Sequence, residues 1–231
     1  MTIPFMKVPE YELTLSNDVK VKYRPFLVKE QKILLIATES ADEKEINSAL
    51  LNVVKSCCLT DIDVTKLPVY DFEYLWLNIR AKSAGEVIKL KLKCPDDENV
   101  TVDHEINIED IKVDLNKKIE TNIQFDTGYG VIMKVPTIEH LYNKKTVLEL
   151  TYNLVRDCIS QIYNNDQLFE TKDLEQKQMN DFIDNLTTQQ YAKLTKYFES
   201  LPLISHTIKY KNPKSGKEFE LLLQGASDFF Q

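Results

Sequence analysis

Two periodicities alternate along this chain, and together they predict helices packed on antiparallel β-hairpins. The clearest change of period lies within residues 67–95. Apolar residues at helical spacing end at Gly85, and a strand that alternates apolar and lysine side chains follows. Gly85 suits the end of a helix because glycine adopts positive φ without strain. Asp71 is the predicted N-cap, since its carboxylate can accept a backbone N–H of the first turn.

The N-terminal part of the chain predicts one hairpin and two helices. Residues 11–24 alternate on both sides of Asn17-Asp18, which indicates a turn between two strands. Helices are predicted at 26–38 and 41–58. The residues expected to be buried are Val28, Ile33, Leu34, Ile36 and Ala37 in the first helix, and Ile46, Leu50, Val53, Val54 and Cys57 in the second.

The rest of the chain is rich first in strands and then in helices. The predicted elements after residue 95 are a turn at 96–99, strands at 100–106, 111–126 and 130–135, a short helix or turn at 137–145, a helix at 146–164, a loop or edge strand at 165–172, helices at 174–185 and 187–200, and a terminal hairpin at 205–224. Strands at the beginning, middle and end with helices between them indicate an α+β fold.

The chain is long enough for one large unit or two small ones. We expect a single unit over 1–231. A subdivision would fall after residue 135, with the hairpin, helices and β-rich middle in 1–135, and the helical section plus the terminal hairpin in 136–231.

Two lysine-alternating hairpins have the outline of zinc-ribbon knuckles. They are KLKCPDDENV at 91–100 and KYKNPKSGKEF at 209–219. A structural zinc site needs four thiolate or imidazole ligands in two close pairs. Cys94 is the only such ligand in the two turns, because Asn212 and Ser215 stand at the other hairpin's ligand positions. We therefore predict degenerate zinc-ribbon-like hairpins with no metal and no cofactor.

The two hairpins differ in charge. Residues 96–110 contain seven acidic side chains and no lysine or arginine, whereas 209–217 contain four lysines. One interpretation is that both are solvated faces. The other is electrostatic complementarity, within the protein or between neighbouring subunits of a homo-oligomer, with Lys211 and Lys214 in contact with the partner. In the second case association or stability should weaken as salt rises.

Composition argues against several other functions. The 29 basic and 36 acidic residues give a net charge of −7, which disfavours binding to nucleic acid. No apolar run has the length of a membrane span, and the first residues lack the pattern of a signal peptide. The spacing of the four cysteines predicts free thiols. No nucleophile, phosphate-loop or metal-ligand motif is present, so we predict that the chain is not an enzyme.

Three aromatic residues are candidates for contact with a partner. Trp76 lies on a helix that is apolar most of the way round, so it either packs in the core or touches a partner. Phe229 and Phe230 stand almost at the chain end. They either fold back onto their own domain, or at least one inserts into a partner subunit as an anchor.

Several stretches resemble one family. DFEYLWLNIRAKSAGE at 71–86, followed by the lysine-rich strand and Cys94-Pro95, resembles the baseplate hub proteins of T-even-type contractile-tailed phages. The resemblance continues, in the same order, at 23–40, 186–210 and 221–230. It implies a role in building the central hub of the tail baseplate together with other hub and tail proteins. The implied locations are the host cytoplasm during assembly and the virion tail baseplate if the protein is retained.

Three functional hypotheses remain open from the sequence. The first is a non-enzymatic structural or assembly component of the hub that acts through protein–protein contacts. The second is a transient assembly chaperone that leaves before the tail is complete. The third is a degenerate zinc-ribbon-like nucleic-acid adaptor, which the acidic composition disfavours.

Overall fold

A computed structural model of the chain describes residues 6–113, 119–126, 128–141 and 147–225. It contains helices and small antiparallel sheets, which confirms the predicted α+β class. The likeness of two of its hairpins to zinc-ribbon knuckles stays a hypothesis.

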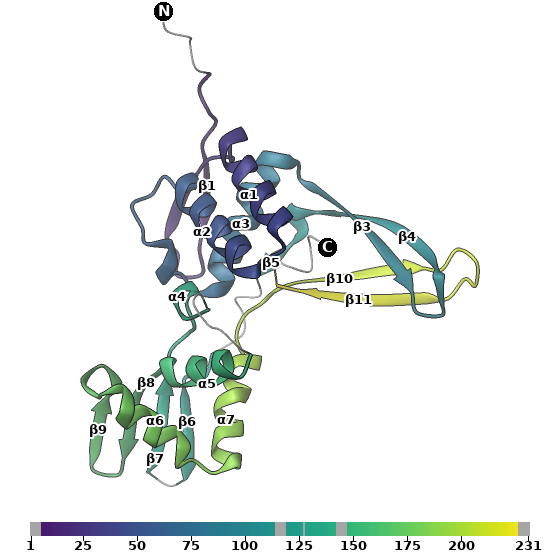
Figure 1. Cartoon of the computed structure of the whole chain (residues 1–231). Coiled ribbons are helices and arrows are strands. Elements are labelled where there is room, and N and C mark those ends of the chain that lie inside the picture. Colours follow the sequence, from purple (N-terminus) through teal and green to yellow (C-terminus); the bar gives the residue numbers. More distant parts are fainter. Residues whose placement is uncertain (1–5, 114–118, 127, 142–146, 226–231) are drawn as a thin grey trace, which may run out of the picture. The chain divides into compact units, whose positions relative to one another are not determined.

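The chain divides into two compact units (Figure 1). Unit 1 comprises residues 1–114 together with 203–231, and unit 2 comprises 115–202. The division falls at different residues from the expected boundary after 135, because the terminal hairpin belongs to unit 1. The expected subdivision after residue 135 stays a prediction. The two units are described separately.

The described residues of unit 1 form three helices and three small sheets. Its strands are β1 (Tyr11–Thr14), β2 (Lys20–Tyr23), β3 (Val87–Cys94), β4 (Asp97–Asn107), β5 (Lys112–Val113), β10 (Ile204–Lys211) and β11 (Glu218–Gln224). Its helices are α1 (Val28–Ser40), α2 (Glu43–Cys57) and α3 (Val69–Ala84), with short 3-10 turns η1 (Val64–Lys66) and η2 (Ile108–Asp110). The sheets pair β1 with β2, β3 with β4, and β10 with both β11 and β5.

Helix α3 is the most deeply buried element of unit 1. Half of its residues are buried: Tyr70, Asp71, Phe72, Leu75, Trp76, Leu77, Ile79 and Ala81. Gly85 follows it with a φ of 108°, as the sequence predicts. Strand β3 then alternates as expected, with Ile88, Leu90 and Leu92 buried between exposed lysines. The change of period at Gly85 thus marks the real junction between helix and strand.

Asp71 has a different role from the predicted N-cap. Helix α3 begins at Val69, two residues earlier, so Asp71 lies inside its first turn. The buried carboxylate accepts hydrogen bonds from the backbone N–H of Ser16 (3.0 Å) and from the Ser16 hydroxyl (2.6 Å). It therefore fastens the turn of the β1–β2 hairpin to α3, a long-range contact that local pattern cannot reveal.

The hairpins β3–β4 and β10–β11 run alongside each other away from the helices (teal and yellow in Figure 1). Their inner faces and the end of α3 share one hydrophobic core. That core consists of Leu77, Ala81, Ile88, Leu90, Leu92, Ile106, Ile108, Ile111, Ile204, Ile208 and Leu223. The turn of the first hairpin contains Pro95 and Asp96, one residue before the predicted position.

Unit 2 places helices against a four-stranded antiparallel sheet of order β6-β7-β8-β9. The strands are β6 (Asn122–Asp126), β7 (Tyr129–Met133), β8 (Ile159–Asn164) and β9 (Gln167–Glu170). The helices are α4 (Ile138–Leu141), α5 (Val147–Asp157), α6 (Gln176–Asp184) and α7 (Thr188–Glu199), with the 3-10 turn η3 (Thr171–Asp173) before α6. Thr187 caps α7 through a bond from Gln190 N, as predicted.

The predicted helix over 146–164 is wrong in its second half. Helix α5 ends at Asp157, and residues from Ile159 form strand β8. Ile159 pairs with β7 and Ile162 with both β7 and β9, so the sheet provides backbone partners on two sides. Both residues are β-branched, and such residues pack well in a sheet. The helical spacing of the apolar residues had suggested one continuous helix.

Two further predictions need correction. The long strand over 111–126 is not continuous: β5 covers only Lys112–Val113 and β6 begins at Asn122, in the other unit. The predicted buried face of the first helix is confirmed at Ala37 and wrong at Val28, Ile33 and Ile36. On α1, Ala37 and Glu30 are buried, while Val28, Ile33 and Ile36 are exposed. In α2, by contrast, Val53, Val54 and Cys57 are buried as predicted.

Candidate functional site

The acidic and basic hairpins meet at their tips. The Asp96 carboxylate accepts a hydrogen bond from Asn212 Nδ2 (2.7 Å) and another from Ser215 Oγ (2.6 Å). The Tyr210 hydroxyl donates to the Lys93 carbonyl (3.0 Å) and so joins β10 to β3. We call Asp96, Asn212 and Ser215 the Asp96 cluster. The sequence singled out Asn212 and Ser215 as positions of missing ligands but did not identify their partner.

Uncharged side chains, those of Asn212, Ser215 and Tyr210, make most of the contacts between the two hairpins. The lysines contribute little. Lys214 Nζ lies 3.6 Å from Asp97 Oδ2, and the lysine is exposed while the aspartate is only partly buried, so the pair contributes little. Lys211 is exposed. The contact thus supports complementarity within the protein, whereas a role of Lys211 and Lys214 in binding a partner, and a dependence of association on salt, stay predictions.

Contacts at the hairpin tips shift the pKa values of Asp96 and Cys94 in opposite directions. Hydrogen bonds from Ser215 and Asn212 hold the pKa of Asp96 below its ordinary value. Burial, with the nearby carboxylates of Asp96 and Asp97, raises the pKa of the Cys94 thiol. At neutral pH the tip therefore holds a carboxylate beside a protonated thiol.

Trp76 lies in the interior of unit 1. It is 8% exposed and stacks on Phe26, with ring centroids 6.3 Å apart and an interplanar angle of 20°. This arrangement supports the packing interpretation of Trp76. Phe229 and Phe230 lie outside the described residues, so their interpretation as partner anchors stays a prediction.

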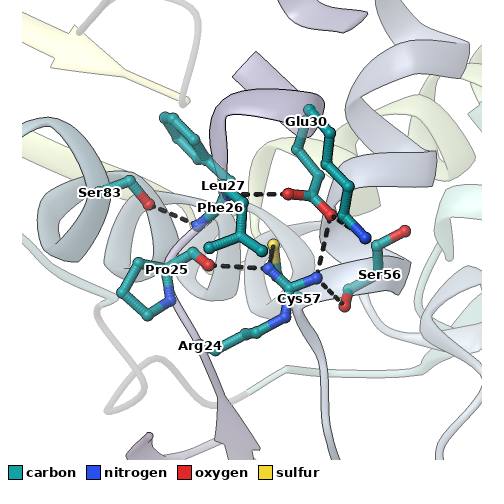
Figure 2. Close-up of polar contacts among 9 residues, drawn as sticks. Arg24, Pro25, Phe26, Leu27, Glu30, Ser56, Cys57 and Ser83 are labelled. Carbon is teal, nitrogen blue, oxygen red and sulfur yellow. Dashed lines mark hydrogen bonds and ion pairs between the residues drawn. The ribbon is translucent and has the colours of Figure 1, made fainter. Parts of the chain in front are cut away.

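A buried ion pair, which the sequence did not predict, joins the end of β2 to α1 and α2 (Figure 2). Arg24 follows β2, and its Nη2 lies 3.0 Å from Glu30 Oε1 and 3.0 Å from the carbonyl oxygen of Ser56 in α2. Its Nη1 donates to the Pro25 carbonyl (2.9 Å) and contacts Cys57 Sγ (3.7 Å). The available signal was an arginine directly before Pro25 and an acidic residue in the first turn of the following helix.

Glu30 completes this junction from α1. It is 3% exposed, and its Oε2 accepts the Leu27 N–H at 2.7 Å, which satisfies a free donor at the start of the helix. Burial raises the pKa of Glu30, but Arg24, the Leu27 N–H and Lys29 outweigh burial and keep the pKa below its ordinary value. The junction therefore holds a charged pair that is well hydrogen-bonded.

Helix α1 presents large apolar side chains to solvent beyond this junction. Val28 and Ile36 are 67% exposed, and Leu35 is 56% exposed. Leu27 and Ile33 are also exposed. We call these five residues the α1 surface. Large apolar side chains that lie exposed within one short segment are a feature of surfaces that contact another protein.

Unit 2 has a smaller apolar surface at the edge of its sheet. Leu168 and Phe169 are exposed on the edge strand β9, and Tyr129 is exposed at the start of β7. A shallow cleft of about 220 Å³ beside it is lined largely by aromatic rings, among them Phe125 and Phe182. The sequence predicts only a loop or edge strand at 165–172, and it does not indicate a function for these residues.

The described residues contain no arrangement that indicates catalysis. No group of three or more His, Cys, Asp or Glu among them is placed to hold a metal ion. Burial raises the pKa of the Cys57 thiol to about 11, so this thiol is protonated at neutral pH and unsuited to act as a nucleophile. Within the same residues, no helix is both long and apolar enough to cross a membrane.

Comparisons with known proteins give one informative result. A protein-family model described as "T4 bacteriophage base plate protein" matches residues 8–231, nearly the whole chain. No curated protein and no solved structure matches the chain. The family match thus covers both units and every candidate surface described above.

Proposed function

The chain belongs to the T4 bacteriophage base plate protein family, and from this premise we propose that it is a non-enzymatic component of the baseplate hub that acts through protein–protein contacts. The single observation that supports contact with other proteins most strongly is the α1 surface. Five large apolar side chains lie exposed on one short segment, next to a rigid buried ion pair. The partners are other baseplate hub and tail proteins.

A rigid support for the α1 surface makes it suitable for a stable contact. Arg24 and Glu30 fix the start of α1 against α2, so the surface does not need to be ordered when a partner binds. Preorganisation of this kind lowers the entropic cost of association. The proposed role is structural rather than enzymatic.

The second candidate is a transient assembly chaperone of the same family. The same exposed apolar surface supports it, because a chaperone also needs a contact surface for hub proteins. In both cases the protein is made in the host cytoplasm, but only a structural component stays in the virion tail baseplate.

Mass spectrometry distinguishes the two candidates. Purified virions and purified baseplate intermediates from the phage that encodes this chain would be digested and quantified against other baseplate proteins. A structural component is expected in both samples at a fixed ratio. A chaperone is expected in the intermediates alone, and a protein missing from both samples would contradict the proposed function.

A further inference from the structure

The tips of the two hairpins in unit 1 share a proline directly after the first candidate ligand position. The first reads Cys94-Pro95-Asp96-Asp97 and the second Asn212-Pro213-Lys214-Ser215. A zinc-ribbon knuckle places its two ligands three positions apart, as at 94 and 97 or at 212 and 215. In the structure Cys94 and Asp97 face each other across the first turn, while Asn212 N donates to the Lys217 carbonyl across the second. The first tip therefore holds its two ligand positions face to face, whereas the second tip closes between Asn212 and Lys217 with Ser215 inside the turn.

The two ligand positions of the second tip converge on one group. Asn212 Nδ2 donates to Asp96 Oδ1 and Ser215 Oγ donates to Asp96 Oδ2, so each position binds a different oxygen of the same carboxylate. Asn212 is 1% exposed. A ligand side chain in a knuckle would point at the metal in the same way, and here the Asp96 carboxylate lies at the point of convergence.

The backbone of the second tip also has the hydrogen bonds expected around a ligand. Asn212 Oδ1 accepts the amides of Lys214 (2.8 Å) and Ser215 (3.3 Å). Groups that bind a metal are held in place by such hydrogen bonds to their other atoms. The amide group of Asn212 thus uses its oxygen to order the turn and its nitrogen to hold Asp96.

The residues at these positions do not fit a zinc ion. Zinc in structural sites binds thiolate and imidazole, whereas an amide and a hydroxyl occupy two of the four positions. The third position, Cys94, is a buried thiol whose pKa is raised by burial and by the nearby carboxylates. The fourth, Asp97, lies by Lys214.

We propose that the two hairpin tips form a knuckle pair in which the Asp96 carboxylate takes the place of the metal ion. The carboxylate crosslinks β3–β4 to β10–β11 through Asn212 and Ser215. The two hairpins therefore keep the geometry of a metal site without requiring a metal ion. Restoring cysteine ligands at these positions should restore metal binding.

The test is a variant of the full chain that carries Asp96→Gly, Asp97→Cys, Asn212→Cys and Ser215→Cys together with the native Cys94. It would be folded in the presence of zinc and titrated with cobalt(II). The expected result is one cobalt ion per chain with the absorption of tetrahedral thiolate coordination. A matched control has Lys214→Cys in place of Ser215→Cys, so its cysteine count is the same but one ligand is displaced. The control is expected to bind cobalt at least about tenfold more weakly.

A second measurement on single variants keeps the proposal testable if the multiple variant does not fold. Asp96→Ala removes the acceptor shared by Asn212 and Ser215, while Asp103→Ala removes an exposed carboxylate elsewhere on β4. Amide hydrogen exchange of Lys214 and Ser215 should become severalfold faster in Asp96→Ala alone. Equal exchange in both variants, or a folded four-substitution variant that binds cobalt no better than its control, overturns the proposal.

Discussion

At the scale of single residues, Arg24 and Glu30 do more for unit 1 than their positions in the sequence indicate. Their ion pair is almost completely removed from solvent, and both side chains also bind backbone groups of neighbouring elements. Removing one partner of such a pair leaves an uncompensated charge in the interior. The pair is therefore a sensitive point for the position of α1.

The first prediction concerns Arg24→Ala. This substitution should lower the free energy of unfolding of unit 1 by about 3 kcal/mol, because Glu30 loses its buried partner. Trp76 is the single tryptophan and lies in unit 1, so its fluorescence during urea denaturation reports this unit. Lys29→Ala is the matched control, since Lys29 is exposed and lies 3.5 Å from the same carboxylate. A loss no greater than that of the control would contradict the role of Arg24.

Acid should weaken unit 1 through Glu30. Its folded pKa lies below its ordinary value, so the unfolded chain binds a proton more readily than the folded protein. The stabilisation is complete above the unfolded pKa, about 4.3, and is lost as pH falls through the folded value. Glu30→Gln should therefore show a flatter loss of stability between about pH 6 and about pH 3 than the wild type.

The acid prediction has a matched control in Glu45→Gln, which changes an exposed carboxylate on α2. Its denaturation midpoint should follow the wild type at every pH. The prediction fails if Glu30→Gln and Glu45→Gln lose stability in parallel.

Residues with a local role were predictable from the sequence, and residues with a long-range role were not. Gly85 and Thr187 end and begin helices through contacts within a few residues, so pattern was sufficient. Asp71 looked like an N-cap, but its partner is Ser16, 55 positions away. Asp96 lies 116 positions from Asn212, and no spacing rule connects them.

At the scale of elements, the structure shows where apolar spacing is ambiguous. Residues 146–164 have apolar positions that fit a helix throughout. The second half nevertheless forms strand β8, which pairs with β7 and β9. Helix α1 has apolar residues on most sides, so spacing alone could not decide which face is buried. The structure buries Ala37 and Glu30 and leaves the larger side chains exposed.

The exposed face of α1 gives the third prediction. Leu35→Glu with Ile36→Glu should leave the protein folded, because both side chains are exposed, but should prevent its incorporation into baseplates. Gln31→Glu with Lys32→Gln is the control, since it changes the charge equally at exposed polar positions of the same helix. Circular dichroism would check folding, and infection with a complementing gene would check incorporation. Normal incorporation of the first variant would remove α1 from the proposed contact surface.

At the scale of the whole molecule, the division into two units was harder to predict than the fold class. Alternating and helical periods along the chain were sufficient for α+β. The terminal hairpin packs against β3–β4, which precedes it by about a hundred residues, so unit 1 is discontinuous in sequence. Periodicity along the chain carries no information on such a return, because the contact joins segments that are far apart in sequence.

The fourth prediction concerns the chain end. Deletion of 227–231 removes Phe229 and Phe230, which lie outside the described residues. If they anchor a partner, the shortened protein should fold and stay soluble but fail to join the hub, because aromatic anchors often dominate an interface. Thermal denaturation and co-purification with baseplates would measure the two properties. Unfolding of the shortened protein would show that the tail packs on its own domain, and normal assembly would reject both roles.

The central claim is that the phage needs this protein to build its baseplate. The most direct test is an early nonsense codon in its gene, followed by electron microscopy of lysates from a host that cannot suppress the codon. The account predicts normal heads without complete baseplates or tails, and recovery of both when the wild-type protein is supplied. Complete contractile tails in the absence of the protein would contradict the account.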